Sequence, residues 1–454
     1  MLLQRTAHTY SFHVVLNPRG IERRLIMAAA SLSARASKAS DTADVEMFKS
    51  FLRIKTVHPK PDLDGCITFL RQQAAEIGLT VAVHEFVPGY PVVVLTRVGT
   101  QPELPSVVLN CHMDVVPVEA DKWNALPAGE DPFTAWESAD GKIYARGSQD
   151  MKCVGAGYLC ALKRMQRETF KRTVHTVWVP DEEVGGSNGM AEFVKSDAFR
   201  ALKTGVALDE GLAHSDDKYV IYYGERTALW LRFTAVGPVG HASKMPKRTA
   251  SERLGKLIEK FHHWRVRSEA KLAAKPQLEI GDVTSVNVTH FYAGVTSDGG
   301  KTFAYNVIPA DGRVVVDTRV SHDEFEAMLR FVDELCAELD LQVEFLNGAG
   351  GRPSVPSGIS SVQSSWCRLL TQQVSKYCPT VKHAVFPAAT DSRYIRGVGI
   401  PAFGFSPMRQ TDSLLHDHNE YLHRNTFLEG IDVYEDVIRV LSNQGPEADM
   451  PAKL

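Results

Sequence analysis

The sequence predicts an α/β protein with a helix-flanked, mostly parallel sheet and a smaller inserted α+β domain. Three observations predict this fold. Short apolar runs rich in β-branched residues alternate with helical stretches up to about residue 210. The pattern changes near Gly224, and the first pattern resumes after Gly358. At 454 residues, the chain also exceeds what one hydrophobic core usually organises.

The apolar runs of the first pattern are short and nearly continuous, as expected of strands that are buried on both faces of a parallel sheet. The predicted strands are Val92–Thr96, Val107–Asn110, Val174–Val179 and Val206–Leu208. The predicted helices between them are Met47–Leu52, Cys66–Ile77, Cys153–Arg167 and Ser187–Lys195, and Gly78 is a C-cap signal.

The second pattern has strands that alternate apolar and polar residues. Its order is strand, helix, strand, strand, helix, strand, which is the split β-α-β plan of a ferredoxin-like antiparallel sheet. The predicted elements are Leu229–Ala235, Ala250–Arg265, Val283–Thr289, Arg313–Thr318, His322–Leu339 and Leu341–Leu346. Helix and strand signals then resume through Trp366–Tyr377, Ala402–Phe405 and Asn425–Ser442. We therefore predict an N-terminal extension over residues 1–42, a large domain over 43–224 and 348–446, and an inserted domain over 225–347.

Composition excludes several classes of function. Hydrophobic content of 44% and charged content of 23% are ordinary for a soluble globular protein. With a net charge of −3 there is no global basic field for nucleic acid or an anionic membrane, and no apolar run is long enough to span a bilayer. The seven cysteines are scattered without a CxxC pair, which indicates a reducing compartment. Any metal site must then use His, Asp and Glu.

The two ends of the chain carry possible address signals. The first forty residues are Arg-rich and acid-poor, as in a mitochondrial transit peptide, but a disordered tail or a true start at Met27 is the explanation that we favour. The C-terminal Ala452–Leu454 resembles the Ser-Lys-Leu peroxisomal address. We expect a cytoplasmic protein, with a peroxisome-like organelle or a mitochondrion as alternatives.

Polar clusters follow three of the predicted buried strands. His112 and Asp114 follow the first, Asp181, Glu182 and Glu183 the second, and Asp209 and Glu210 the third. Ligands of open α/β sheets bind outside the carboxyl ends of the strands. A further acid, Asp150, opens a predicted helix after a turn.

Carboxylates that converge at one sheet edge repel each other unless a cation lies between them. Imidazole and carboxylate ligands without thiolate suit zinc, cobalt or manganese. Each feature also has a simpler explanation: a structural histidine, a solvated acidic turn, or an N-cap at Asp150. From the pattern alone, a metal site and unrelated polar turns remain equally open.

Eight motifs, which occur in order between about residues 45 and 442, resemble the aminoacylase-1 family. This family is part of the two-zinc metallopeptidase group that also holds carboxypeptidase G2 and the carnosinases. The matching stretches are Asn110–Pro117, Tyr144–Lys152, Val179–Gly186, Ala207–Gly211, Gly240–Ser243, Tyr305–Ala310, Pro387–Arg396 and Leu414–Glu420.

The resemblance implies two zinc ions per subunit, with Co²⁺ or Mn²⁺ possible. One would be held by His112, Asp150 and Glu210, and the other by Asp150, Glu183 and His416. Asp114 would orient His112, since residues behind metal ligands tune them. Glu182 would be the general base.

The resemblance also implies that residues 225–347 form a lid and dimerisation domain. His241 would stabilise the oxyanion in the partner subunit of a homodimer. Asn306, Arg319 and Thr390 would bind a small N-acyl amino acid, with Arg319 on its carboxylate. The implied reaction is hydrolysis of N-acyl-L-amino acids. A dipeptidase or carboxypeptidase with the same metal core is the alternative, and a non-catalytic metal-binding protein is more remote.

Overall fold

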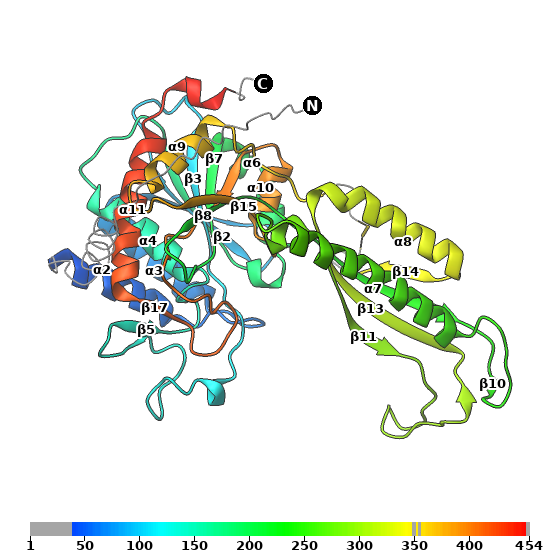
Figure 1. Ribbon diagram of the computed structural model, residues 1–454. Coiled ribbons are helices and arrows are strands. Elements are labelled where there is room, and N and C mark those ends of the chain that lie inside the picture. The colour runs from blue at the N-terminus through cyan, green and yellow to red at the C-terminus, as the bar shows by residue number, and fades with distance from the viewer. Residues whose placement is uncertain (1–38, 347–350, 353–355, 451–454) are drawn as a thin grey trace, which may run out of the picture. The chain divides into compact units, whose positions relative to one another are not determined.

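The computed structural model describes residues 39–346, 351–352 and 356–450 (Figure 1). The Arg-rich N-terminal segment and the C-terminal Ala452–Leu454 lie outside the described residues, as does part of the Pro- and Gly-rich stretch after residue 346. In the described part of the chain, none of the helices combines the length and the apolar character needed to cross a membrane.

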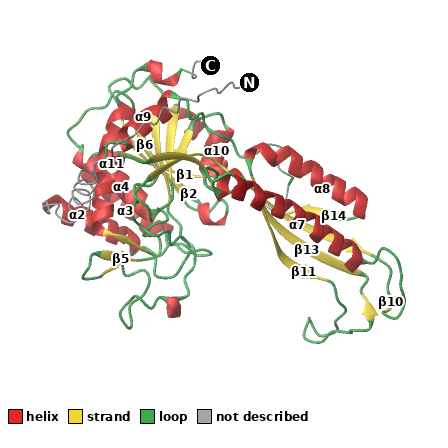
Figure 2. Cartoon of the chain, viewed as in Figure 1, coloured by secondary structure: helices red, strands yellow, loops and turns green. Residues whose placement is uncertain are grey.

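An eight-stranded sheet carries the larger part of the structure (Figures 1 and 2). Its strand order is β1-β2-β6-β3-β7-β16-β8-β15. The central pairs β6–β3, β3–β7 and β7–β16 are parallel, as is β8–β15, whereas β1–β2, β2–β6 and β16–β8 are antiparallel. The strands are Thr80–Glu85 (β1), Pro91–Arg97 (β2), Ser106–His112 (β3), Val174–Val179 (β6), Thr204–Asp209 (β7), Tyr219–Glu225 (β8), Val381–Phe386 (β15) and Ala402–Gly404 (β16). The predicted α/β class is confirmed.

Helices cover both faces of this sheet, which explains why its central strands are continuously apolar. On one face, Val107 and Leu109 of β3 pack in a core with α2 (Ala39–Leu52), α3 (Leu63–Ile77), α4 (Lys152–Arg164), α9 (Ser365–Val374) and α11 (Arg424–Ser442). On the other face, Val108 of β3 packs with α5 (Met190–Phe193), α6 (Asp197–Ala201) and α10 (Ser392–Gly397). Successive residues of a strand point to opposite faces of the sheet, so the residues on both faces must be apolar when helices cover both.

The helix predicted over Ser187–Lys195 is wrong in its extent. The structure has only the four residues of α5 there, after a 3-10 turn, Glu182–Val184 (η2), and a loop. Gly185 and Gly186 adopt positive φ angles of 103° and 62°, which lie outside the helical region. Both glycines precede the predicted start, and within the predicted range Gly189, at φ −96° and ψ −96°, is the N-cap, so the helix begins only at Met190.

A second sheet has the strand order β11-β13-β9-β14, with every pairing antiparallel. Its elements are Thr227–Val236 (β9), Ala250–Ala274 (α7), Ser285–Tyr292 (β11), Asp311–Val320 (β13), Phe325–Leu339 (α8) and Gln342–Phe345 (β14), in the predicted order. Buried residues alternate along β9 and β13, and they share a separate hydrophobic core with α7 and α8, which lie side by side on one face (Figure 2).

Candidate metal centre

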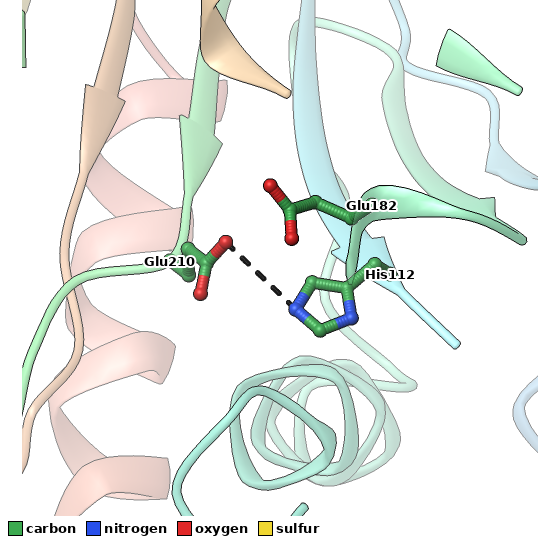
Figure 3. Close-up of side chains that lie close together, drawn as sticks. All are labelled: His112, Glu182 and Glu210. Carbon is green, nitrogen blue, oxygen red and sulfur yellow. Dashed lines mark ion pairs between the residues drawn. The ribbon is translucent and has the colours of Figure 1, made fainter. Parts of the chain in front are cut away.

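The polar clusters of the sequence meet at one edge of the eight-stranded sheet. His112 is the last residue of β3, η2 follows β6, and Glu210 follows β7. These three strands are parallel neighbours, so their carboxyl ends share an edge. Figure 3 shows the side chains of His112, Glu182 and Glu210 converging from these separate elements.

The five predicted ligands form one chain of contacts. Asp150 lies at its centre: its Oδ1 atom is 3.1 Å from His112 Nε2, and its Oδ2 atom is 3.2 Å from His416 Nε2. His416 Nε2 also lies 3.0 Å from Glu183 Oε2, and His112 Nε2 lies 3.8 Å from Glu210 Oε1. The two carboxylate oxygens of Asp150 thus face two different imidazoles, which is the arrangement that a bridging ligand needs.

The electrostatics of this cluster fit bound cations. Burial raises the pKa values of Glu182 and Glu210 well above their ordinary range, and it raises the pKa of Glu183 to about 7. Neighbouring carboxylates add to each of these increases, and the Oε1 atom of Glu183 is buried without a hydrogen-bond partner among the described residues. Divalent cations would neutralise this repulsion and use the unpaired oxygen.

His112 is oriented by the main chain of Asp114 rather than by its carboxylate. The distance from His112 Nδ1 to the Asp114 carbonyl oxygen is 2.9 Å, whereas the Asp114 Oδ1 atom is 3.6 Å away. A carbonyl oxygen only accepts, so Nδ1 carries the proton and Nε2 is left as the coordinating atom.

The Asp114 carboxylate instead holds the η2 turn. It accepts hydrogen bonds from the backbone N–H groups of Glu182 (3.1 Å) and Glu183 (3.0 Å), and it lies 3.2 Å from His58 Nε2. One buried carboxylate therefore orients two adjacent glutamates whose side chains face different partners.

Two further buried acids position ligand loops. Glu420 accepts hydrogen bonds from Arg146 Nη1 (2.8 Å) and from the backbone N–H groups of Gly147 (3.0 Å) and Gln149 (2.6 Å), and so ties the turn before Asp150 to the loop of His416. The same loop holds His416 at a φ angle of 60°, which is uncommon for a residue other than glycine.

Asp209 is the second of these buried acids and fixes the backbone at Glu210. Its Oδ1 atom accepts from Asn110 Nδ2 (3.0 Å) and from the Glu210 backbone N–H (2.9 Å), and Ser392 donates to its Oδ2 atom (2.8 Å). Sequence reasoning assigned no role to Asn110, Asp209, Ser392 or Glu420. Their positions next to ligands or within the matched motifs were the available signal.

The remaining predicted site residues lie outside the ligand cluster. His241 and Asn306 are exposed and lie close together, because the Ala242 N–H donates to the Asn306 carbonyl oxygen (2.8 Å). Arg319 forms a two-point ion pair with Asp317, at 2.8 and 3.1 Å. Thr390 is buried, and its backbone N–H and hydroxyl both donate to Glu225, at 2.6 and 2.8 Å.

Imidazole and carboxylate donors at the carboxyl ends of three parallel strands, within a mixed α/β sheet, are suited to hold divalent cations, as a metal-dependent hydrolase requires. The sequence model of peptidase family M20/M25/M40 matches residues 108–440, and the chain belongs to this family.

Similarity to characterised proteins extends over nearly the whole chain. It is 44% identical to aminoacylase-1 of Mus musculus over 409 residues, which is 89% of this chain and 96% of the mouse protein. Identity to aminoacylase-1 of Homo sapiens is 42%, over 88% of this chain and 95% of the human protein.

Solved structures of the family share the fold. An M20 family metallo-carboxypeptidase of Sulfolobus solfataricus superposes with a TM-score of 0.66 at 17% identity, covering 89% of this chain and 99% of the archaeal chain. Human carnosine dipeptidase 1 gives a TM-score of 0.60 at 14% identity, covering 90% and 97%.

Proposed function

We propose that this protein hydrolyses N-acyl-L-amino acids to a carboxylate and a free L-amino acid. The observation that carries the proposal is the joint presence of the five-residue donor cluster and Glu182 in a chain 42–44% identical to mammalian aminoacylase-1. The carboxypeptidase and the dipeptidase of similar fold are only 17% and 14% identical to this chain. Hydrolysis of peptides is therefore the less supported activity.

We propose that zinc occupies the site in two positions. His112, Asp150 and Glu210 would hold one ion, and Asp150, Glu183 and His416 the other. Such a pair of cations lowers the pKa of water and polarises a carbonyl oxygen. Elemental analysis should find two zinc ions per chain, and zinc should restore activity after chelation. Full recovery with manganese or cobalt, but none with zinc, would contradict this choice of metal.

Glu182 is suited to transfer a proton from the attacking water to the leaving amine. It extends from the same turn as Glu183, and one of its oxygens lies within 4.8 Å of ligand atoms of His112 and Glu210. It would take a proton from the attacking water and deliver it to the amide nitrogen as the carbon–nitrogen bond breaks. The products are then a carboxylate and an amine, with one water consumed.

Arg319, Asn306 and Thr390 would select the substrate. Asp317 engages Nε and Nη2 of Arg319, which leaves the Nη1 donors for the carboxylate of an amino acid. The hydroxyl of Thr390 already donates to Glu225, so Thr390 would contribute shape rather than a hydrogen-bond donor.

We propose that the protein is a homodimer in which His241 reaches the partner's site. The support is exposure: Met245, four residues after His241, and Tyr305, which directly precedes Asn306, are 95% and 92% exposed. The edge strand β11 also exposes Val288 and Phe291. Large exposed apolar side chains on an edge strand are typical of a surface that a partner covers.

The test is hydrolysis by the zinc-loaded enzyme of N-acetyl-L-methionine and of a panel of dipeptides. We expect rapid deacetylation with release of free methionine, and slow dipeptide cleavage. Good turnover of dipeptides with negligible deacetylation would instead establish the dipeptidase alternative.

A further inference from the structure

A cationic side chain outside the ligand set lies beside the proposed general base. Arg393, on the short helix α10, places its Nη1 atom 4.0 Å from Glu182 Oε1. The same nitrogen donates to the Thr390 carbonyl oxygen (2.9 Å), and the guanidinium carbon lies 4.6 Å from the centre of the Tyr394 ring.

Arg393 also contacts the turn that carries both glutamates. Its Nη2 atom donates to the Gly185 carbonyl oxygen (2.8 Å), and the Tyr394 hydroxyl donates to the same oxygen (2.6 Å). Gly185 directly follows η2. The turn is therefore held at its start by Asp114 and at its end by Arg393 and Tyr394.

The turn has hydrogen bonds of its own, from the Gly185 N–H to the Glu182 carbonyl oxygen (2.8 Å) and from the Gly186 N–H to the Asp181 carbonyl oxygen (2.7 Å), and the contacts of Arg393 and Tyr394 add to them. Gly185 and Gly186 both have positive φ angles, and glycine pairs restrict the backbone little. Gly186 cannot be replaced by a residue that would restrict it, because a Cβ atom there would come within 2.3 Å of Asp391 Oδ1. The contacts from Asp114, Arg393 and Tyr394 therefore restrict the turn further and help to fix the orientation of Glu182.

We propose that Arg393 is a positioning residue, which with Tyr394 fixes the Gly185 carbonyl and so aims Glu182 at the reacting atoms. A guanidinium suits this position, because its planar fork reaches two carbonyl oxygens and a carboxylate at once, whereas an ammonium group acts as a point charge. The proposal rests on the role of Glu182 in the proposed function.

Arg393→Ala tests this inference, and Arg97→Ala is its matched control. Arg97 also donates to two carbonyl oxygens, those of Met165 (3.0 Å) and Leu162 (2.8 Å), and it also lies over an aromatic ring, that of Phe170. It has no contact with the turn among the described residues. The substrate is N-acetyl-L-methionine, and kcat, KM, metal content and melting temperature are measured for each protein.

We expect R393A to lower kcat roughly 100-fold, with KM and metal content close to wild type, because a small misplacement of a reacting group has an effect of this order. The Arg393 side chain is 19% exposed, so added guanidinium can enter the space it leaves. Guanidinium chloride below denaturing concentration should restore part of the kcat of R393A, but should not raise that of R97A or the wild type.

The proposal is overturned if R393A keeps the wild-type kcat, or if its metal content falls with kcat and guanidinium restores neither. Should R393A fail to fold, Tyr394→Phe decides the question: losing one hydroxyl should lower kcat several-fold at constant KM, and an unchanged kcat overturns the proposal. If the wild type cleaves only dipeptides, the proposed function fails, and the same variants are compared on a dipeptide.

Discussion

At the residue scale, two adjacent glutamates have different surroundings and hence different expected roles. Glu183 points to His416, with 3.0 Å between Oε2 and Nε2, and belongs to the donor cluster. Glu182 faces the Arg393 guanidinium and lies near His112 and Glu210. Local sequence patterns could not separate them, because consecutive acids in a turn look alike; only the resemblance to a family assigned them different roles.

Glu182→Gln should remove the general base without removing the metal. The amide cannot accept a proton, so we expect kcat to fall by about two to four orders of magnitude. Metal content should stay at the wild-type level, because Glu182 is not among the five ligands. Glu192→Gln, at an acid that pairs with Lys195 on the surface, is the control and should leave kcat unchanged. A fully active E182Q enzyme would refute the role of Glu182.

His175 of β6 should make stability depend on pH. Burial lowers its pKa to about 4, from an ordinary value of 6.5. As the pH falls, His175 is therefore protonated in the unfolded chain before it is protonated in the folded protein. The stability that depends on neutral His175 is fully present above pH 6.5 and is lost as the pH falls toward 4. Lowering the pH from 7 to 5 should cost about 2 kcal/mol through this group.

The measurement is urea unfolding of the wild type and of His175→Gln at both pH values. Other titrating groups cancel in the comparison, so the variant should lose less stability than the wild type between pH 7 and pH 5. Equal losses in the two proteins would show that His175 does not contribute.

At the element scale, the site depends on loops that are distant in sequence but joined by buried acids. Glu420 connects the turn of residues 145–150 to the loop that carries His416, and Asp114 connects the end of β3 to η2. Local patterns predicted most strands and long helices correctly, because burial on both faces leaves a clear apolar signal. They failed at Ser187–Lys195, where the helical periodicity was present but Gly189 lies outside the helical region and α5 begins only at Met190.

Glu420→Gln should weaken the fold and the metal site together. Its carboxylate is fully buried and paired with Arg146, so we expect a loss of about 3 kcal/mol in the free energy of unfolding. Metal affinity should fall about 10- to 100-fold, because the two N–H groups before Asp150 bond to different oxygens of Glu420 and the amide keeps only one of them. Chelator competition and urea unfolding measure the two effects.

Glu168→Gln provides the contrast for this prediction. It breaks a partly exposed ion pair with Arg439 (2.9 Å), and surface pairs contribute at most about 1 kcal/mol. If E420Q were no more destabilising than E168Q, the connecting role of Glu420 would be wrong.

At the scale of the whole molecule, the proposed dimer predicts complementation between inactive subunits. His241→Ala and Glu182→Gln should each be inactive as homodimers. A mixed dimer contains one site with Glu182 intact and His241 supplied by the other subunit, so mixing the two after dissociation should recover activity. If mixed dimers form but remain inactive, His241 does not act across the interface.

The sequence by itself determined the fold class, the order of the elements and the placement of polar clusters after strands. These features follow from local apolar periodicity, which burial imposes on each segment separately. Its resemblance to a family also pointed to all five ligands, including His416, which no local pattern distinguishes from His418.

Only the tertiary structure decided how these residues are oriented. It shows that Asp150 faces two imidazoles, that the Asp114 carboxylate holds a turn rather than His112, and that Arg393 grips the Gly185 carbonyl. The physical reason is that such contacts join segments up to hundreds of residues apart. Hydrogen-bond direction depends on where the folded backbone places each group, and this is not encoded in any single segment.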